Sequence, residues 1–548
     1  MRKAIERVPK GNDYIILDRC AGTGNLEYAL SDEELSHVVI NTYEMQEWIA
    51  LKNRIGNSVR CIIPPIPDDK AELPKKNEFG FLAGSNALSK SFINRPEIKQ
   101  YIDNPKCTII LFENPPYRDS SASDKESAEE TEEQTMNVTS FVFDEMQKHL
   151  NEFSNSNVST ARDVCNQFIW SGFEYYLRQE TDSYILLSPS KCFKSLGLLN
   201  YEYGGGFLFN REHFHASPAS IMCTLWFNKK KDTLESIKVD AYDIDKNGHL
   251  EFVKKVDIKK VHKTFEPYFD RRTFPDDVEV GVFCETNGVE TNGRKCDGKS
   301  YYNSGKNGNP RMIAYCRTIN YPIAAMNRYF TRQASYGARG FYVREDNYLT
   351  KLPLLVAKNY PLKNWFDREV LMTSSDGGEK YIKDKEFLKR CLIYTCLSGG
   401  NKCISFDGSD GNYYHNELCL DGDTLANETL KSMELLDVEK GLINMYNKIL
   451  FEIKRKSDDG AYKYSEYNPK YSYGVHQISL EIDISVPKRD EHGNVIYKKP
   501  NSKGEIKPEV VKKYGQNISN LINPLQRALD KYYLDFIAPK MFEYELIK

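Results

Sequence analysis

The feature that most constrains the fold is a short apolar strand that runs directly into a glycine-rich loop. Asp13–Asp18 has the composition of a strand buried in a sheet. Gly22 and Gly24 follow, and glycine lets the backbone approach a bound ligand closely because it has no side chain. Leu26–Leu30 can then open a helix whose N-terminus faces that ligand. This order predicts an α/β domain with a nucleotide-type cradle, although a plain glycine-rich turn remains open as an alternative.

Two acidic residues narrow the class of ligand that such a cradle can take. A dinucleotide-binding loop, G-x-G-x-x-G, would place its third glycine at position 27. Glu27 stands there instead, and its negative charge would repel a pyrophosphate. A second strand, His37–Thr42, is followed by Glu44, where an acid can accept hydrogen bonds from ribose hydroxyls. The sequence therefore favours a nucleotide-like ligand without a diphosphate, although Glu44 taken alone is a weak signal, because surface acids are commoner.

A second motif with chemical potential ends a later apolar run. Ile109–Phe112 resembles a buried strand, and it leads through Glu113 into Asn114-Pro115-Pro116-Tyr117. The two proline rings fix the backbone beside a polar amide and an aromatic face. Ligands of open α/β sheets bind at the carboxyl ends of the strands, which is where this motif falls. The motif alone also fits a proline-rich turn that leaves a strand.

Charge and composition exclude few function classes. The chain has 75 Lys and Arg against 78 Asp and Glu, so any nucleic-acid contact must come from local basic faces. No run approaches the ~18 apolar residues of a membrane helix, and the N-terminus lacks the apolar core of a signal peptide. The 13 cysteines include no C-x-x-C pair. We therefore expect a cytoplasmic protein with reduced thiols and no membrane segment.

The first half of the chain contains further elements. Arg118–Glu133 is acidic and Ser-rich, which predicts a mobile loop beside the Asn-Pro-Pro-Tyr motif, as a lid or as an insertion without function. Ser220–Phe227 is expected to be the last strand of the first domain. Lys229–Lys263 alternates lysines with apolar residues, which indicates exposed strands or a hairpin around Asp245–Gly248.

The second half of the chain gives weaker indications of structure and function. Residues 265–420 interleave Arg and Tyr with glycines, which suits phosphate and base contacts and equally suits ordinary loops. Leu425–Lys456 predicts one long helix, and a last helix is expected near Ile518–Tyr533. Lys488–Lys513 is polar and rich in Lys and Pro, which predicts an exposed excursion.

Together the two motifs resemble S-adenosylmethionine-dependent DNA adenine-N6 methyltransferases of restriction-modification systems, in the subgroup whose cofactor loop precedes the catalytic motif. Asp18–Glu27 (D-R-C-A-G-T-G-N-L-E) is similar to the cofactor loop, and Asn114–Tyr117 matches the catalytic motif in full. Asn86 stands where the family usually has Asp. The resemblance implies that the cofactor is bound by Asp18, Cys20, Ala21, Gly22, Gly24, Glu44 and Asn86. The resemblance also implies that Asn114, Pro115, Pro116 and Tyr117 are the catalytic residues.

The resemblance also implies a fold and a domain order. Residues 1–228 are expected to form a Rossmann-like class I methyltransferase domain with a mixed seven-stranded sheet. Residues 229–423 are expected to be a mixed α/β target-recognition region, and 424–548 a helical C-terminal part. The implied partner is double-stranded DNA, with a nuclease or specificity subunit as a further partner, and no metal is required for the chemistry.

The sequence leaves alternatives open. Protein-glutamine methyltransferases also use Asn-Pro-Pro-Tyr on this fold, although a large Tyr- and Arg-rich C-terminal half argues for a DNA substrate. A DNA-binding subunit that keeps the pocket without chemistry is a third possibility. In the family a segment upstream of the cofactor strand helps to hold the methionine end of the cofactor. Only about a dozen residues precede Ile15, so an N-terminally incomplete cofactor site is also expected.

Overall fold

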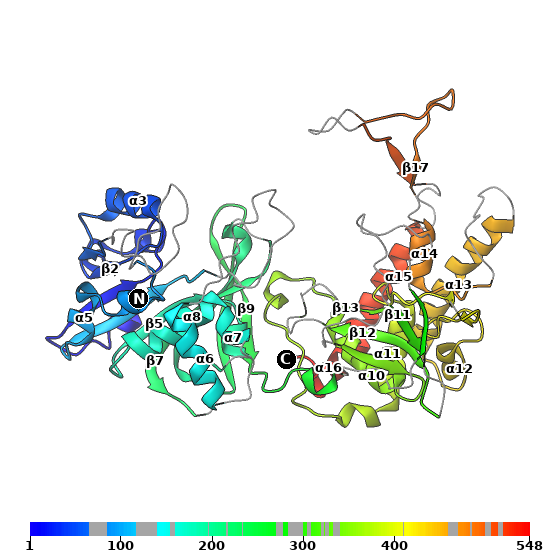
Figure 1. Cartoon of the computed structure of the whole chain (residues 1–548), viewed down its shortest axis with the longest axis horizontal. Coiled ribbons are helices and arrows are strands. Elements are labelled where there is room, and N and C mark those ends of the chain that lie inside the picture. Colours follow the sequence, from blue (N-terminus) through cyan, green and yellow to red (C-terminus); the bar gives the residue numbers. More distant parts are fainter. Residues whose placement is uncertain are drawn as a thin grey trace. The chain divides into compact units, whose positions relative to one another are not determined.

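We describe the protein from a computed structural model in which the chain forms two compact units (Figure 1). Unit 1 comprises Met1–Lys260 and Asn364–Val370, and unit 2 comprises Val261–Lys363 and Leu371–Lys548. The structure describes residues 1–64, 85–116, 140–153, 159–194, 197–214, 217–232, 234–269, 278–282, 300–303, 308–318, 323, 328–331, 340–408, 410–458, 470–482, 485–498, 506–512 and 519–548. Tyr117 and the acidic segment 118–133 lie outside these residues.

A mixed sheet forms the centre of unit 1. Among the described residues it has nine strands, in the order β3 (Cys61–Ile62), β2 (Val38–Ile40), β1 (Asp13–Asp18), β4 (Cys107–Glu113), β5 (Ser183–Ser188), β7 (Ser220–Lys230), β6 (Tyr201–Asn210), β8 (Ser236–Ile244) and β9 (Leu250–Lys259). The first five strands are parallel, and β7 runs antiparallel to both β5 and β6. This arrangement is consistent with a Rossmann-like domain.

The prediction of seven strands is wrong. The additional strands are β8 and β9, the hairpin that the sequence predicts around Asp245–Gly248. β8 pairs in parallel with β6, and β9 pairs antiparallel with β8, so the hairpin continues the sheet beyond β6. The compact unit accordingly extends past residue 228, where the sequence places the end of the first domain, to Lys260.

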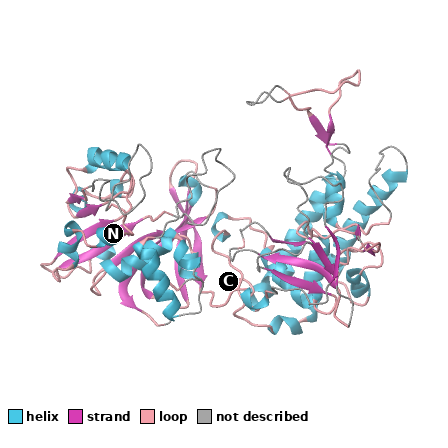
Figure 2. Ribbon diagram, viewed as in Figure 1, coloured by secondary structure: helices cyan, strands magenta, loops and turns pink. Residues whose placement is uncertain are grey.

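Both faces of the central strands are covered, as Figure 2 shows by the helices around the magenta sheet. Ile16 and Ile110 face one core with Leu51 of a helix, whereas Ile15 and Ile109 face a second core on the other side. This alternation follows from the two-residue repeat of a strand. The described helices of unit 1 are α1 (Arg2–Ile5), α2 (Asp32–Leu35), α3 (Met45–Ile55), α4 (Lys90–Ile93), α5 (Pro96–Ile102), α6 (Phe141–Phe153), α7 (Ser159–Arg162), α8 (Val164–Ser171) and α9 (Lys191–Lys194). Shorter or irregular turns are η1 (Glu27–Ala29), η3 (Gly172–Tyr176), η4 (Arg211–Phe214) and η6 (Trp365–Asp367).

A distant segment completes unit 1. The Ser220 hydroxyl donates a hydrogen bond to the carbonyl of Arg368 at 2.5 Å, and the Ser190 hydroxyl donates to the carbonyl of Glu369. Val370 lies in the core beside the sheet. No pattern in the sequence predicts this contact, because it joins residues that are far apart along the chain.

Unit 2 is built mainly from helices around its own core. Its described strands are β10 (Val278–Val282), β11 (Ser300–Asn303), β12 (Met312–Thr318), β13 (Arg328–Thr331), β14 (Gly340–Arg344), β15 (Phe406–Asp407), β16 (Tyr413–Tyr414), β17 (Ser485–Pro487) and β18 (Val510–Lys512). Its described helices are α10 (Tyr348–Lys358), α11 (Lys385–Leu397), α12 (Leu425–Lys431), α13 (Asp437–Asp458), α14 (Val475–Ile482), α15 (Ser519–Tyr532) and α16 (Ala538–Glu543), with turns η5 (Glu266–Tyr268), η7 (Lys380–Lys383) and η8 (Tyr533–Ile537).

The single long helix predicted over Leu425–Lys456 is two helices, α12 and α13. The start of α13 is held by the buried Glu439 carboxylate, which accepts a hydrogen bond from the Leu436 amide at 2.8 Å and pairs with Lys389 at 3.3 Å. The break leaves the Leu436 amide without a helical acceptor, and the Glu439 side chain supplies one. The assignment of 229–423 to DNA recognition and of 424–548 to a helical tail remains a prediction.

Candidate functional site

The fold brings the two sequence motifs to one edge of the sheet. β1 and β4 are parallel neighbours, with Leu17 opposite Leu111. Their carboxyl ends therefore lie side by side, and each leads directly into one of the motifs. Asn114 follows the end of β4 as an exposed residue, Pro115 is buried and Pro116 is exposed. The glycine-rich loop and the first three residues of Asn-Pro-Pro-Tyr thus share the edge where ligands of such sheets bind.

The loop after β1 is a tight backbone turn. Gly22 and Gly24 have φ of +58° and +80°, in the left-handed region that favours glycine. A Cβ on Gly24 would lie 2.7 Å from Leu51 Cδ1 of α3, so only glycine fits there without displacing that side chain. The helix expected over Leu26–Leu30 is only the single 3-10 turn η1, with α2 beginning at Asp32. The loop therefore runs into a single turn and not into a helix whose N-terminus could face a ligand.

Two carboxyl groups are buried behind this loop. Asp18 and Glu27 are both fully buried, and Oδ2 of Asp18 and both oxygens of Glu27 accept no hydrogen bond from any residue that the structure describes. Burial and the nearby Glu27 hold the pKa of Asp18 well above its usual range, and burial raises the pKa of Glu27. From the sequence, Glu27 is expected to repel a pyrophosphate by its negative charge, but in the structure its side chain is buried in the protein.

An ion pair that the sequence did not predict joins the two motifs. Arg19 directly follows β1, and Glu113 is the last residue of β4. Nε and Nη2 of Arg19 donate to Oε1 and Oε2 of Glu113 at 2.5 and 2.9 Å, and the Arg19 amide donates to Oε1 at 3.2 Å. Both side chains are fully buried. The residue before Asn114 is therefore fixed to the residue after Asp18 by three hydrogen bonds.

The remaining donors and acceptors of this pair are also satisfied. Arg19 donates to the Ser171 hydroxyl at 2.9 Å and to the Phe168 carbonyl at 2.8 Å, and its guanidinium lies 4.5 Å from the centre of the Tyr176 ring. The Tyr184 hydroxyl donates to Oε2 of Glu113 at 2.5 Å. The Glu113 carboxylate holds the pKa of Arg19 well above its usual range despite burial. In the sequence, the only indication of this ion pair is that Arg19 and Glu113, which have opposite charges, each follow an apolar run.

A buried amide connects the loop to a third segment. Asn41, just after β2, donates through Nδ2 to the carbonyls of Arg19 and Ser85, both at 2.8 Å, and its own backbone carbonyl accepts from the Ala21 amide at 2.9 Å. Asn86 therefore lies next to a residue that is tied to the loop. Its Oδ1 accepts from the Leu88 amide at 3.1 Å, which makes it a local turn residue in this structure.

The other predicted cofactor residues are placed as follows. Glu44 is exposed at the start of α3, beyond the end of β2, and makes no capping hydrogen bond. The amide of Cys20 donates to Oδ1 of Asp18 at 2.8 Å. Burial and the Asp18 carboxyl raise the pKa of the Cys20 thiol well above its usual range.

The glycines leave the backbone of this loop accessible. Gly22 and Gly24 carry no side chain at the turn, so a ligand could lie against the backbone there. No cluster of three or more His, Cys, Asp or Glu side chains with metal-binding geometry is present in the described part of the chain.

Comparisons with known proteins leave the family open. No protein-family model matches the chain, and no curated protein matches it. A solved structure that shows a likeness is the Type IIL restriction-modification enzyme MmeI in complex with DNA, at 13% sequence identity and a TM-score of 0.24. The match covers 52% of this chain and 41% of that chain, so the chain spans less than half of that enzyme. At this TM-score the likeness carries no weight for function. No helix among the described residues is long and apolar enough to cross a membrane.

Proposed function

We propose that the chain is a DNA adenine-N6 methyltransferase that uses S-adenosylmethionine and acts in a restriction-modification or phage-defence system. The observation that supports this most is the meeting of the glycine-rich loop and Asn114-Pro115-Pro116 at one sheet edge, joined by the buried pair of Arg19 and Glu113. Each motif alone has an ordinary structural explanation. The two motifs lie together at the edge of a mixed α/β sheet where ligands usually bind, and this combination favours methyl transfer.

The residues at the loop fit the cofactor. Gly22 and Gly24 keep the backbone of the loop open to it, and the buried Asp18 carboxyl fixes the start of the loop by accepting the Cys20 amide. Glu44 is exposed beyond β2, where it is free to accept from ribose hydroxyls. Bound S-adenosylmethionine would supply an activated methyl group on its sulfonium, so the task of the protein is alignment.

The motif after β4 supplies the acceptors that the chemistry requires. The exocyclic amine of adenine has its lone pair delocalised into the ring. By the resemblance, the Asn114 side-chain oxygen and the Pro115 carbonyl accept the two N6 hydrogens as the nitrogen becomes tetrahedral. An adenine must leave the duplex to reach this site, at an unstacking cost of a few kcal/mol. Tyr117 would offer its ring to the flipped base.

The test is methyl transfer from labelled S-adenosylmethionine to mixed-sequence duplex DNA, with Asn114→Ala as the matched control. Asn114 is exposed, so the substitution removes an acceptor without opening a cavity. We expect label in DNA with the unmodified chain and none with Asn114→Ala. Label in a protein acceptor instead would indicate protein-glutamine methylation, and DNA binding without cofactor binding would indicate a non-catalytic subunit. Either result would overturn the proposal.

A further inference from the structure

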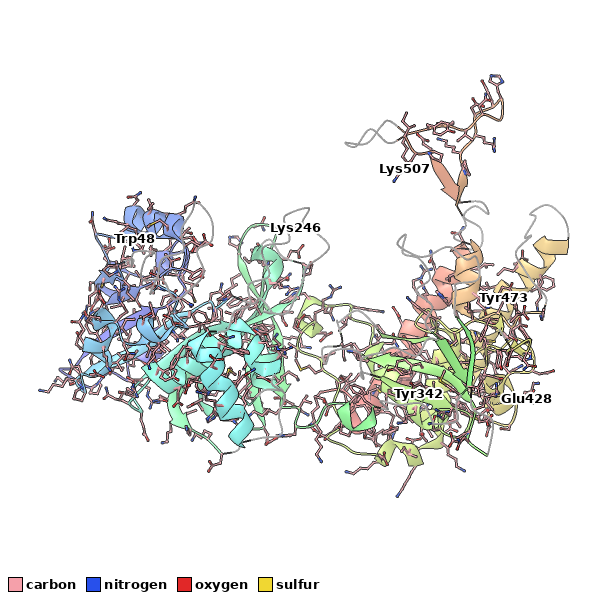
Figure 3. All side chains as sticks on the ribbon, viewed as in Figure 1. Trp48, Lys246, Tyr342, Glu428, Tyr473 and Lys507 are labelled. Atoms are coloured by element: carbon pink, nitrogen blue, oxygen red, sulfur yellow. The ribbon has the colours of Figure 1, made fainter. Side chains whose placement is uncertain are left out.

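Glu47 is an acid whose carboxylate lies against the glycine-rich loop. It stands in the first turn of α3, next to Trp48, which Figure 3 labels. A Cβ on Gly22 would lie 3.6 Å from Oε1 of Glu47. Among the described residues, leaving out the chain neighbours of Gly22, no other heavy atom lies within 4 Å of that position. A ligand that lies against the backbone of Gly22 therefore comes close to the Glu47 carboxylate.

A hydrogen bond fixes the position of this carboxylate. The hydroxyl of Thr42, a buried residue just after β2, donates to Oε2 of Glu47 at 2.6 Å. Glu44, to which the spacing in the sequence points, is exposed at the start of α3 and makes no capping hydrogen bond. A side chain that is already held in place loses less freedom when a ligand binds beside it. Of these two acids after β2, Glu47 is therefore the one with a fixed position relative to the loop.

The loop has few amides left for a phosphate. The Cys20 amide donates to Oδ1 of Asp18 at 2.8 Å, and the Ala21 amide donates to the Asn41 carbonyl at 2.9 Å. The Gly24 amide donates to the Ala21 carbonyl at 3.0 Å. Loops that bind phosphate present such amides to the ligand instead. Three amides of this loop are thus engaged within the protein.

A basic side chain contacts the loop at a different point. Nη1 of Arg54 donates to the Thr23 carbonyl at 2.7 Å and to Oδ1 of Asn25 at 3.1 Å. Arg54 lies near the end of α3 and Glu47 near its start, which separates them by about 10 Å along the helix axis. Arg54 therefore holds the loop in place, whereas the charged group at Gly22 is the Glu47 carboxylate.

We propose that Glu47 makes the loop selective for nucleosides that carry no phosphate, the role that the sequence assigns to Glu27. Glu27 is buried behind the loop, whereas Glu47 lies at its surface beside Gly22. A phosphate placed there would meet a like charge at short range, and few amides would compensate for the repulsion. The inference rests on the proposed function in taking the loop as the cofactor site, and it names the residue that determines which class of cofactor is accepted.

The experiment compares two ligands that share an adenosine, S-adenosylhomocysteine and ADP, on the full chain. Calorimetry gives the affinity for S-adenosylhomocysteine, and displacement of it gives the affinity for ADP. The unmodified chain should prefer S-adenosylhomocysteine. Glu47→Gln keeps an acceptor for the Thr42 hydroxyl and should lower this preference about fivefold or more, the effect of like charges about 4 Å apart even in water. Glu47→Asp keeps the charge and should keep most of the preference.

Two control variants separate the local charge from other effects. Glu44→Gln removes an acid that would meet the ribose of both ligands, so it should change both affinities by the same factor. Glu33→Gln removes the same charge from an exposed position on α2 and should change neither affinity. Burial and the charge of Glu33 raise the pKa of Tyr14, near the amino end of β1, whereas the loop follows the carboxyl end of that strand.

The outcomes separate this inference from the proposed function. If the unmodified chain prefers S-adenosylhomocysteine and Glu47→Gln keeps the full preference, Glu47 is not the determinant, and the methyltransferase proposal is untouched. If Glu33→Gln lowers the preference as much as Glu47→Gln, the effect is one of net charge and the inference is wrong. If the unmodified chain binds neither ligand or prefers ADP, the proposed function fails and the inference fails with it. None of the substituted side chains is buried, so thermal unfolding should be unchanged in all variants.

Discussion

Glu113→Gln isolates the charge of the buried pair that joins the two motifs. The substitution preserves shape and leaves no cavity, but it removes the negative charge beside Arg19. Removing one member of a buried ion pair typically costs about 3–5 kcal/mol, because the other charge stays buried without compensation. Arg19 would retain Ser171, the Phe168 carbonyl and the Tyr176 ring. We therefore expect a loss near the lower end, about 3 kcal/mol in the free energy of unfolding of unit 1.

The assay can report on unit 1 alone. All four tryptophans of the chain, Trp48, Trp170, Trp226 and Trp365, lie in unit 1, and Figure 3 labels the first of them. Urea unfolding followed by tryptophan fluorescence in the full chain therefore measures the unit that contains the pair. A shift of the midpoint at unchanged slope gives the loss of stability.

A matched control comes from the same unit. Glu97 pairs with Arg95 through two hydrogen bonds of 3.0 and 2.9 Å, but its side chain is 27% exposed. Glu97→Gln removes the same charge from the same bidentate geometry and should cost less than about 1 kcal/mol. Replacing both Arg19 and Glu113 by apolar residues of similar size should recover much of the loss. Equal losses in the free energy of unfolding for Glu113→Gln and Glu97→Gln would refute the claim that burial makes the pair of Arg19 and Glu113 the more important one for stability.

Two further predictions concern the cofactor loop. Gly22→Ala should lower the free energy of unfolding by about 1–2 kcal/mol, because it places an L-residue in the left-handed region. Gly24→Ala should lower it more, since its Cβ would also lie 2.7 Å from Leu51 Cδ1. Urea unfolding measures the difference between the two variants, and equal losses would contradict the close approach of Gly24 to Leu51. Asp18 has a pKa well above its usual range in the folded protein, so its contribution to stability is present below the pKa of the unfolded chain and is lost as pH rises through the folded pKa. Asp18→Asn should therefore flatten the decline in the stability of unit 1 as pH rises above the pKa of an unfolded aspartate, measured by urea unfolding at several pH values; a steeper decline in the variant would contradict the assignment.

The positions of the strands could be predicted because burial on both faces leaves continuous apolar runs. Ile109–Phe112 and Ser220–Phe227 fall within β4 and β7, and the hairpin around Asp245–Gly248 is confirmed. The number of strands could not be predicted, because the hairpin's alternation of lysines with apolar residues is the same whether it stands alone or joins the edge of a sheet. Its pairing with β6 is a long-range event that leaves no periodicity.

Two backbone features of the candidate site could be predicted. Gly22 and Gly24 have the positive φ that a glycine-rich turn allows, and Asn114 directly follows a strand. The directions of the charged side chains could not be predicted. Glu27 turns inward toward Asp18, and Arg19, just after β1, pairs with Glu113 at the end of the neighbouring strand β4. Arg and Glu are rarely fully buried, so the sequence gives no reason to expect a buried pair. The register of β1 against β4 brings Arg19 and Glu113 together.

The central claim is that the edge at Asn114 transfers a methyl group to adenine. It is tested most directly by digesting DNA to nucleosides after incubation with the protein and S-adenosylmethionine, and identifying the methylated nucleoside by mass spectrometry. We predict N6-methyldeoxyadenosine with the unmodified chain and none with Asn114→Ala. Methylation of cytosine, or equal N6-methyldeoxyadenosine from both proteins, would contradict the claim.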